Sequence, residues 1–332
     1  MRAAIVNQPG GPEVLSVTDW SKPEITGAYQ LLIRVKAAGL NPIDYKVRRA
    51  LDAFPVQKPL ILGHDGAGIV EAVGSGVTCF RPGDQVYFCQ PPLNGRQGSH
   101  AEYTVVDELL AAPKPKNLSF IEAAAAPLVL ITAWEALYDR ITLTEGDPVL
   151  IEAGGGGVGH IAIQLARLKG CRVATTVSTD QKADLARRAG SERLIRYREQ
   201  DVVTEIASWT GGEGVAAAMD NVGGEVFSRC CQATRLYGEV VTLLEPPAGM
   251  VWWEARLRNL KVALEMMLTP VWLNRRELMR HHGKILEEAA ALFEAGRLFV
   301  HVGATFPLEQ IGEAHKLLET KPPAGKVVVE IP

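Results

Sequence analysis

The 332-residue sequence predicts an α/β protein of two domains, one rich in β-strands and one built on a doubly wound parallel sheet. The length is sufficient for two hydrophobic cores. Short β-type runs separated by Gly and Pro fill the first third of the chain. Beyond them, strands and helices alternate around a glycine-rich turn at residues 154–159. These three observations define the predicted fold class.

The N-terminal region has the composition of a β-barrel or sandwich. Runs of β-branched and aromatic residues are bounded by glycines and prolines, as in a chain of short strands joined by turns. We expect these strands at residues 31–35, 68–73, 85–88 and 102–106.

The pattern changes near Ser119, where Ser119 and Glu122 form a capping box before an alanine-rich helix. Helical and β-type periodicities then alternate, which is typical of a parallel sheet with crossover helices. The predicted strands of this sheet cover residues 149–151, 173–177, 215–219 and 238–243, and its predicted helices cover 158–169 and 182–189. A longer helix is expected at residues 275–294, and the tail is expected to end in a strand at residues 325–331.

Composition excludes several functional classes. The net charge of −3 gives no basic excess for nucleic acid or for an anionic membrane. The longest apolar stretch, residues 123–134, is too short to span a bilayer and contains Pro127. The N-terminus does not have the pattern of a signal peptide. The five cysteines form neither a disulfide framework nor a C-x-x-C pair, so we expect a reducing cytoplasm.

The glycine turn carries the strongest functional signal. Gly154, Gly156 and Gly159 form a G-x-G-x-x-G pattern that follows a predicted strand and opens a predicted helix. We expect Gly154 to permit the tight turn, Gly156 to admit a pyrophosphate, and Gly159 to allow close packing of helix on strand. The helix opens at Gly157 and Val158, so its first N–H groups would face the phosphates. The alternative is a flexible glycine loop without a ligand.

The next strand indicates which dinucleotide binds. It ends without the Asp or Glu that binds the ribose 2′-hydroxyl of NAD, and Asp180 comes two residues too late. Ser178, Lys182 and Tyr197 could instead surround a 2′-phosphate, which predicts NADPH. Alternatively, Lys182 is a solvated helix residue. Glu152, just before the turn, would repel phosphate, so we expect its side chain to face away.

Taken together, the motifs resemble the medium-chain dehydrogenase/reductase superfamily, and within it the zinc-independent quinone oxidoreductase and enone reductase branch. The resemblance covers nearly the whole chain and rests on residues 38–44, 62–70, 81–86, 130–134, 154–159, 220–224 and 325–328. It implies a GroES-like domain formed by residues 1–123 and 268–332, and a Rossmann NADP-binding domain formed by residues 124–267.

The resemblance also implies further cofactor contacts. Asn41 and Thr132 would flank the nicotinamide, Val241 and Thr242 would belong to the loop that lines the ring, and Lys326 would contact the cofactor. Relatives commonly form homodimers through the edge of the Rossmann sheet. Here residues 259–264 are the expected edge strand.

Zinc is not expected. In zinc-dependent relatives a Cys–His–Cys set binds the catalytic metal, and the matching positions here are Asn41, His64 and Leu128. One ligand cannot hold a catalytic zinc, which needs three from the protein. The four cysteines of a structural zinc lobe are missing too, since only Cys89 lies in that region. We therefore predict that His64 is a hydrogen-bonding residue.

Without a metal, alcohol oxidation lacks its usual means of stabilising the alkoxide, whereas quinones and α,β-unsaturated carbonyls already contain an electron sink. Residues 41–46 look like the version found in alkenal and enone reductases. Tyr45 and Lys46, together with Asn41, are the candidate catalytic residues. Alternatively, Lys46 pairs with Asp44 on the surface, or Tyr45 packs with a tethered hydroxyl. We expect Asp44 to anchor the loop.

The predicted function is therefore NADPH-dependent reduction of a small-molecule quinone or enone. Two alternatives stay open from the sequence: an alcohol dehydrogenase that kept the fold, and a non-enzymatic NADPH-binding protein.

Overall fold

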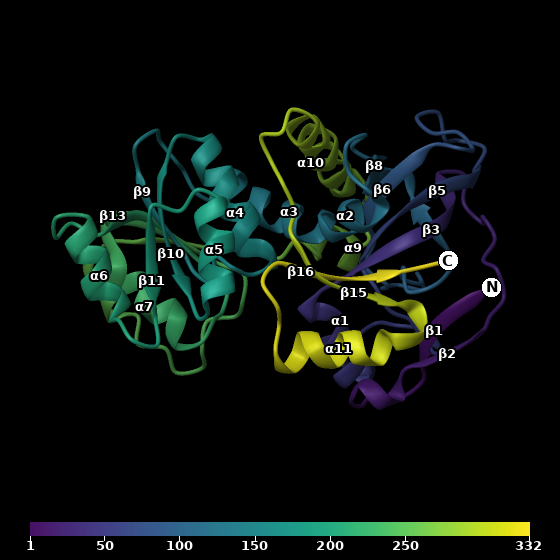
Figure 1. Ribbon diagram of the computed structural model, residues 1–332, viewed down its shortest axis with the longest axis horizontal. Coiled ribbons are helices and arrows are strands. Elements are labelled where there is room, and N and C mark those ends of the chain that lie inside the picture. The colour runs from purple at the N-terminus through teal and green to yellow at the C-terminus, as the bar shows by residue number, and fades with distance from the viewer. The chain divides into compact units, whose positions relative to one another are not determined.

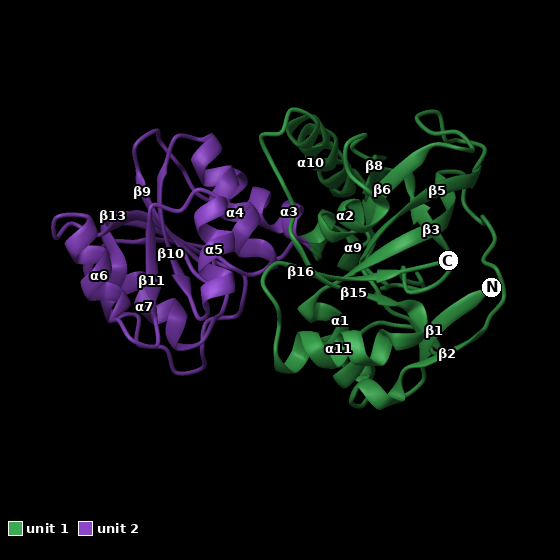
Figure 2. Cartoon of the chain, viewed as in Figure 1, with its two compact units in different colours: residues 1–128, 268–332 green, residues 129–267 purple.

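The computed structural model describes residues 1–332, which form two compact units (Figure 2). Unit 1 comprises Met1–Leu128 and Leu268–Pro332, and unit 2 comprises Val129–Met267. The sequence placed the first boundary between residues 123 and 124 and the second between 267 and 268. The predicted alanine-rich helix thus belongs to unit 1.

Unit 2 is built on a six-stranded parallel sheet in the order β11-β10-β9-β12-β13-β14. Figure 1 labels β9, β10, β11 and β13 of this sheet. Its strands are β9 (Pro148–Ile151), β10 (Arg172–Val177), β11 (Arg193–Arg196), β12 (Val215–Asp220), β13 (Thr234–Thr242) and β14 (Lys261–Leu264). This is the doubly wound order, in which the chain direction across the sheet reverses between β9 and β12. The predicted parallel strands are confirmed, and β14 lies at the predicted edge.

Helices cover both faces of this sheet. They are α3 (Pro127–Trp134), α4 (Gly157–Leu168), α5 (Asp180–Arg188), α6 (Val202–Trp209), α7 (Glu225–Ala233) and α8 (Trp253–Leu257), with a π-helical turn at Glu135–Asp139. Right-handed crossovers place α4 and α5 on one face and α6 on the other. Contacts agree, because α4 packs with α5, and α6 packs with α7.

Unit 1 contains two sheets. The larger has the order β15-β16-β3-β5-β6-β8, with β7 also paired to β3, and the smaller has the order β2-β1-β4. The strands are β1 (Arg2–Val6), β2 (Ser16–Asp19), β3 (Gln30–Leu40), β4 (Leu60–Ile61), β5 (Asp65–Val73), β6 (Gln85–Cys89), β7 (Tyr103–Asp107), β8 (Ala111–Pro113), β15 (Val302–Pro307) and β16 (Lys326–Glu330). Because β16 pairs antiparallel with β3, the end of the chain completes the sheet begun near its start.

The helices of unit 1 are α1 (Pro42–Arg49), α2 (Phe120–Ala125), α9 (Thr269–Trp272), α10 (Arg276–Glu294) and α11 (Ile311–Thr320). The predicted capping box starts α2: Glu122 N donates to Ser119 Oγ over 3.2 Å, and Ser119 N donates to Glu122 Oε2 over 2.8 Å. Both N–H groups at this helix start are therefore satisfied.

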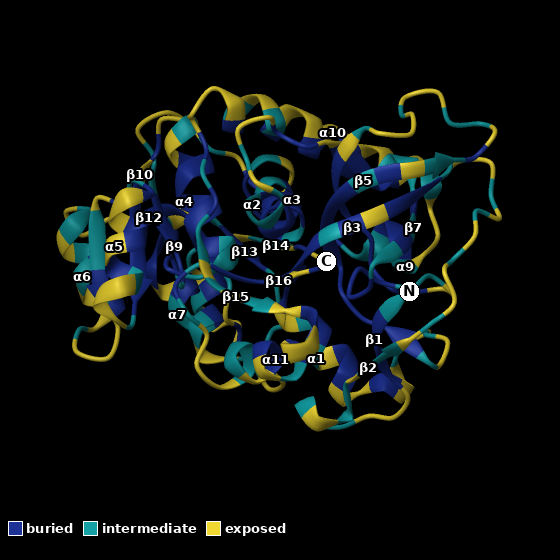
Figure 3. Ribbon diagram, turned by 45° about the vertical axis from the view of Figure 1, so that its right-hand side comes forward, coloured by how far each residue is buried: buried dark blue, intermediate teal, exposed yellow.

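Burial follows the layers of each unit. The central strands β9 and β12 are buried along nearly their whole length, as expected for a parallel sheet with helices on both faces (Figure 3). In unit 1 the largest core cluster lies between the long sheet and its helices and includes Leu31, Ile33, Phe88 and Met279. No helix combines the length and apolarity that crossing a bilayer requires.

Candidate functional site

The glycine turn joins β9 to α4, and its glycines have different roles. A Cβ on Gly154 would lie 2.1 Å from Thr175 Oγ1, and one on Gly159 would lie 2.3 Å from the carbonyl oxygen of Ala153. Gly159 thus has the predicted role in close packing. Gly154 differs from the prediction, because the left-handed residue of the turn is Ala153, with φ 55°. Gly154 is needed for close approach to β10.

Gly156 is the open position. A Cβ there would meet only the Ala153 carbonyl oxygen, at 3.2 Å, so the protein leaves this side of the N-cap of α4 unfilled. Gly157 and Val158 open the helix, as predicted. The bare N–H groups and the helix dipole therefore face a space that an anion could occupy.

Sequence reasoning missed Gly155, the variable position of the motif. A Cβ there would lie 2.4 Å from Lys182 Cβ, so the absent side chain lets α5 approach the turn. No sequence signal separates this glycine from its neighbours, because the contact joins two elements through space.

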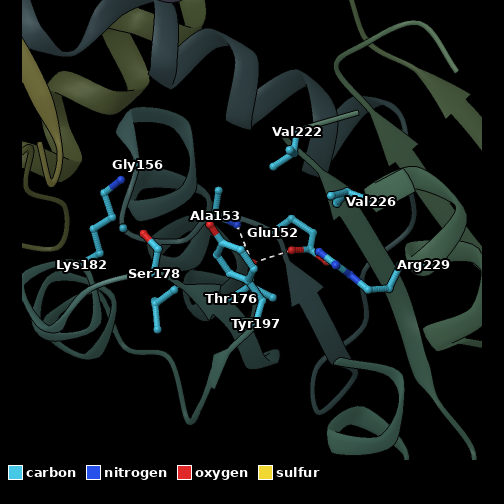
Figure 4. A pocket seen from close by; sticks show the side chains of 12 residues that line it. Glu152, Ala153, Gly156, Thr176, Ser178, Lys182, Tyr197, Val222, Val226 and Arg229 are labelled. Carbon is cyan, nitrogen blue, oxygen red and sulfur yellow. Dashed lines mark hydrogen bonds and ion pairs between the residues drawn. The ribbon is translucent and has the colours of Figure 1, made fainter. Parts of the chain in front are cut away.

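A cavity of about 210 Å³ opens beside the turn, entirely within unit 2 (Figure 4). Its lining comes from the carboxyl ends of β9, β10 and β11, from the turn itself, from the loop after β12, and from α5 and α7. The lining residues are Glu152, Ala153, Gly155, Gly156, Thr176, Val177, Ser178, Lys182, Tyr197, Val222, Val226 and Arg229. The structure therefore brings Gly156, Ser178, Lys182 and Tyr197 together. The cavity that they line lies at the strand ends where doubly wound folds bind ligands.

Three polar side chains in this cavity have no partner within the protein. The Ser178 hydroxyl, the Lys182 ammonium and the Tyr197 hydroxyl make no hydrogen bond or ion pair. Asp180 does not offset this, because its carboxylate pairs with Arg196. Thr179 caps α5 by accepting from Lys182 N over 3.3 Å, which places Lys182 in the first helical turn. The cavity thus presents uncompensated donors and one positive charge.

The position of the Glu152 side chain differs from the prediction. Its side chain lines the cavity, whereas the sequence led us to expect it to face away. The reason is local pairing: Oε1 accepts from Arg229 Nε over 3.2 Å and from Nη2 over 3.1 Å, and Oε2 accepts from the Thr176 hydroxyl. Burial raises the pKa of Glu152, and Arg229 opposes that rise. The charge of Glu152 is therefore compensated inside the protein.

The loops after β12 and β13 are tied to each other. Asp220 Oδ2 accepts from the Thr242 hydroxyl over 2.9 Å, and Asp220 Oδ1 accepts from Val222 N and Gly223 N over 2.9 and 2.8 Å. The side chains of Val241 and Thr242 are buried, as is that of Thr132 on α3. Their contact with a nicotinamide ring stays a prediction.

In unit 1, Asn41 and Lys326 share a buried polar cluster with Asp65. The Lys326 ammonium donates to the Asn41 side-chain oxygen over 2.5 Å and to the Leu40 carbonyl over 2.8 Å, and lies 3.4 Å from Asp65 Oδ2. Asn41 Nδ2 donates to Asp65 Oδ2 over 2.9 Å. Burial raises the pKa of Asp65 and lowers that of Lys326, which the mutual attraction opposes. The predicted cofactor contacts of Asn41 and Lys326 stay untested.

The positions that match zinc ligands in relatives all lie in unit 1. Asn41 offers an amide already bound to Asp65 and Lys326, and Leu128 has no ligand atom in its side chain. His64 Nδ1 lies 2.6 Å from Asp44 Oδ1, so His64 is a hydrogen-bonding residue, as predicted. These positions do not supply the three protein ligands of a catalytic zinc.

The segment after Asn41 forms α1. Asp44 is fully buried and accepts from Asn41 N over 2.8 Å, so it anchors the loop as expected. An ion pair between Lys46 and Asp44 does not form, because Asp44 is committed to His64, and Lys46 is exposed without an ionic partner. Tyr45 is half-buried and its hydroxyl is not tethered. Arg48, by contrast, is buried against Glu319 and His315.

Comparison with known proteins agrees with this architecture. Residues 27–116 match the alcohol dehydrogenase GroES-like domain, and residues 189–329 match the zinc-binding dehydrogenase family. The chain is 34% identical to the chloroplastic NADPH-dependent alkenal/one oxidoreductase of Arabidopsis thaliana, over 99% of this chain and 79% of the relative. It is 31% identical to the 2-haloacrylate reductase of a Burkholderia species, over 98% of both chains.

Solved structures show the same fold. An alcohol dehydrogenase superfamily protein from Novosphingobium aromaticivorans superposes with a TM-score of 0.93 at 32% identity, over the full length of both chains. Escherichia coli quinone oxidoreductase complexed with NADPH superposes with a TM-score of 0.88 at 29% identity, over 99% of this chain and 100% of the other. The chain belongs to the medium-chain dehydrogenase/reductase superfamily, as an oxidoreductase related to its quinone oxidoreductases and alkenal/one reductases.

Proposed function

We propose that the protein is an NADPH-dependent oxidoreductase that transfers hydride, without zinc, to a quinone or to the C=C bond of an α,β-unsaturated carbonyl. One observation carries the cofactor assignment: Ser178, Lys182 and Tyr197 face one cavity with no partner for their polar atoms. A 2′-phosphate would accept hydrogen bonds from all three and would compensate the lysine charge. Relatives that bind or use NADPH support the same assignment.

The glycine turn would hold the pyrophosphate. Gly154, Gly155 and Gly159 bring strand and helices close together, and Gly156 leaves the N-terminus of α4 uncovered. A reduced nicotinamide, when bound, supplies a hydride. By their likeness to the family's positions, Asn41, Thr132, Val241 and Thr242 remain the proposed contacts of the rest of the cofactor. The resemblance implies a contact with Lys326 as well, but the Lys326 ammonium is committed to Leu40, Asn41 and Asp65 within the protein.

The donor set around Asn41 and His64 supports the proposed class of hydride acceptor. Without three zinc ligands at these positions, the site would lack a metal to stabilise an alkoxide, which favours a substrate that carries its own electron sink. When hydride adds to an enone or a quinone, negative charge collects on the carbonyl oxygen. The protein must then place a hydrogen-bond donor at that oxygen.

Lys46 and Tyr45 are the proposed donors, because each has an uncommitted polar group on α1. An ammonium donates a charge-assisted hydrogen bond and would polarise the carbonyl, and a phenol could orient the substrate or supply a proton. We expect Lys46→Ala to lower kcat/KM for enones at least about tenfold with NADPH affinity unchanged. Lys46→Arg should retain most of the activity. Unaltered turnover in Lys46→Ala would remove this residue from the mechanism.

The activity test follows loss of NADPH absorbance with a naphthoquinone, phenanthrenequinone, cyclohexenone and short alkenals. Turnover of quinones or enones supports the proposal. Alcohol-dependent reduction of NADP⁺ would indicate an alcohol dehydrogenase instead. NADPH binding without turnover of any compound would indicate a non-enzymatic binding protein.

We further propose a homodimer formed through β14. This strand is the edge of the sheet, and the apolar Leu264 and Met266 on or beside it are 63% and 50% exposed. An uncovered edge with apolar side chains pairs readily with another chain. Light scattering should give a dimer for the natural protein and a monomer for Leu264→Lys/Met266→Lys. The control Leu273→Lys changes an equally exposed leucine of unit 1 and should leave the dimer intact.

A further inference from the structure

An ion pair closes one end of the cavity beside the glycine turn. The Glu152 carboxylate points toward Arg229 on α7, and Val222 and Val226 lie above the pair (Figure 4). Glu152 is 1% exposed, whereas the Arg229 side chain keeps 26% of its surface exposed. The carboxylate is therefore the buried member of the pair, and the guanidinium is the member that a ligand in the cavity could contact.

The proposed NADPH site determines what would lie at this end, so the present inference rests on that function. The pyrophosphate would lie at Gly156 and the 2′-phosphate at Ser178 and Lys182. The adenine base is attached to the same ribose as the 2′-phosphate, so it must extend from there along the cavity. The walls beyond that point include the apolar side chains of Ala153, Val222 and Val226, which suit the faces of a flat ring.

Arg229 has the chemistry to contact such a ring. Glu152 Oε1 binds Nε and Nη2, which fixes the plane of the guanidinium, and Nη1 makes no hydrogen bond within the protein. A fixed guanidinium stacks on an aromatic face or donates to a ring nitrogen with little further loss of side-chain freedom. We propose that the Glu152–Arg229 pair forms the adenine-binding end of the cavity, with Arg229 contacting the base and Glu152 positioning Arg229.

A purely structural ion pair is the competing explanation. A carboxylate buried at the end of a parallel strand needs a partner in any case, because an unpaired buried charge is strongly destabilising. The two explanations differ in what happens to nucleotide affinity once both charges have been removed together.

The test measures binding of AMP and of 2′,5′-ADP by calorimetry. Glu152→Gln/Arg229→Met removes the pair without leaving a buried charge alone. Arg229→Lys keeps the charge but removes the planar group, which guards against misfolding of the double variant. We expect the double variant to bind both ligands about tenfold more weakly, and Arg229→Lys to weaken both in the same direction. Because Arg229 would touch the base, the affinity ratio of the two ligands should stay constant.

Lys182→Met is the matched control, since it should reduce the preference for 2′,5′-ADP while AMP affinity stays near that of the natural protein. If the folded double variant and Arg229→Lys bind both ligands as tightly as the natural protein, the pair is only structural and the inference is wrong. If the natural protein binds NADPH but the variants lose only the preference for the 2′-phosphate, Arg229 contacts phosphate and the inference is also wrong. Failure of the natural protein to bind either NADPH or 2′,5′-ADP would overturn the proposed function itself.

Discussion

The cavity beside the glycine turn and the buried cluster around Asp65 are both polar, yet their side chains are used in opposite ways. In the cavity, the polar groups of Ser178, Lys182 and Tyr197 have no partner in the protein. In the cluster, Asn41, Asp65 and Lys326 satisfy one another at distances of 2.5 to 3.4 Å. Unsatisfied donors around an open volume indicate a ligand site, whereas satisfied ones indicate architecture.

Lys182 and Lys326 show this difference between the cavity and the cluster most clearly. Family resemblance implies that both Lys182 and Lys326 contact the cofactor, but only the ammonium of Lys182 is uncommitted. Lys326 is buried and donates to the backbone of β3 and to Asn41, where it holds the closing strand β16 against the start of α1. A lysine of this kind contributes more to folding than to an external ligand.

The largest expected effect comes from replacing these lysines one at a time. Lys326→Met leaves the fully buried Asp65 without its cation, so we expect a loss of about 4 kcal/mol in unfolding free energy. Lys182→Met removes a partly exposed charge and should change stability by less than about 0.5 kcal/mol. Urea denaturation of both variants measures the contrast, with NADPH titration of the folded proteins alongside.

In the NADPH titration we expect the two variants to rank in the opposite order from their order in stability. Lys182→Met should weaken NADPH, and Lys326→Met should leave the affinity of the folded protein within a few-fold of the natural one. A stable Lys326→Met protein that no longer binds NADPH would contradict the architectural role and favour the direct contact that the resemblance implies.

The next effect concerns cofactor choice. Ser178→Asp/Lys182→Ala replaces two donors to a 2′-phosphate by a repelling carboxylate and an apolar group. Each lost charge-assisted hydrogen bond is worth about 1.5 kcal/mol or more, so NADPH should bind about 100-fold more weakly. NADH lacks that phosphate and should be much less affected. Equal weakening of both cofactors, measured by fluorescence titration, would show that the assignment to the 2′-phosphate is wrong.

Much of this cavity was predictable from sequence because its parts follow the fold. The parallel strand order places the carboxyl ends of β9, β10 and β11 side by side, and Ser178 and Tyr197 directly follow β10 and β11. Once the glycine turn identifies β9, the two positions must converge on the same edge. Helix α5 starts at Asp180, two residues before the predicted start, because Thr179 is its cap.

The pairings between distant residues were not predictable in this way. Glu152 and Arg229 are 77 positions apart, and Asp65 and Lys326 are 261 apart. A buried acid at the end of a core strand implies some partner, but neither periodicity nor spacing identifies it. The prediction for the orientation of Glu152 is wrong for this reason: it rests on repulsion between its carboxylate and phosphate, whereas an arginine on α7 compensates that charge.

A smaller effect is expected from substitutions at Gly156 and Gly154, which should act on NADPH affinity and on stability, respectively. Gly156→Val adds a side chain on the open side of the N-cap, so folding should be nearly unchanged and NADPH affinity should fall by about 2 kcal/mol, or roughly 30-fold. Gly154→Ala places its Cβ against Thr175 inside the protein, so it should lower stability by about 1–3 kcal/mol instead. Thermal unfolding and NADPH titration of both variants separate the two roles. Loss of stability in Gly156→Val would mean that the open side is filled by protein.

The smallest expected effect concerns His100, a buried polar residue of unit 1 that is not satisfied. His100 is fully buried, neither of its ring nitrogens has a hydrogen-bond partner, and its ring packs edge-on against His315 at 5.6 Å. Burial lowers its pKa to about 4; Asp44 opposes that shift and His64 adds to it. Burial likewise lowers the pKa of His315, which Arg48 also faces, to about 3.

Because the folded-state pKa of His100 lies below its usual value of 6.5, the unfolded chain binds more protons between those two values. Stability from His100 is complete above about pH 6.5 and falls by about 1 kcal/mol per pH unit toward pH 4. His100→Phe keeps a flat ring without a titrating group. Its melting temperature should therefore decline less steeply on acidification than that of the natural protein, while nucleotide affinity at neutral pH stays the same. Parallel acid profiles for the two proteins would mean that His100 is already hydrated or protonated in the folded state, and that the contrast between the satisfied cluster and the open cavity is weaker than the geometry indicates.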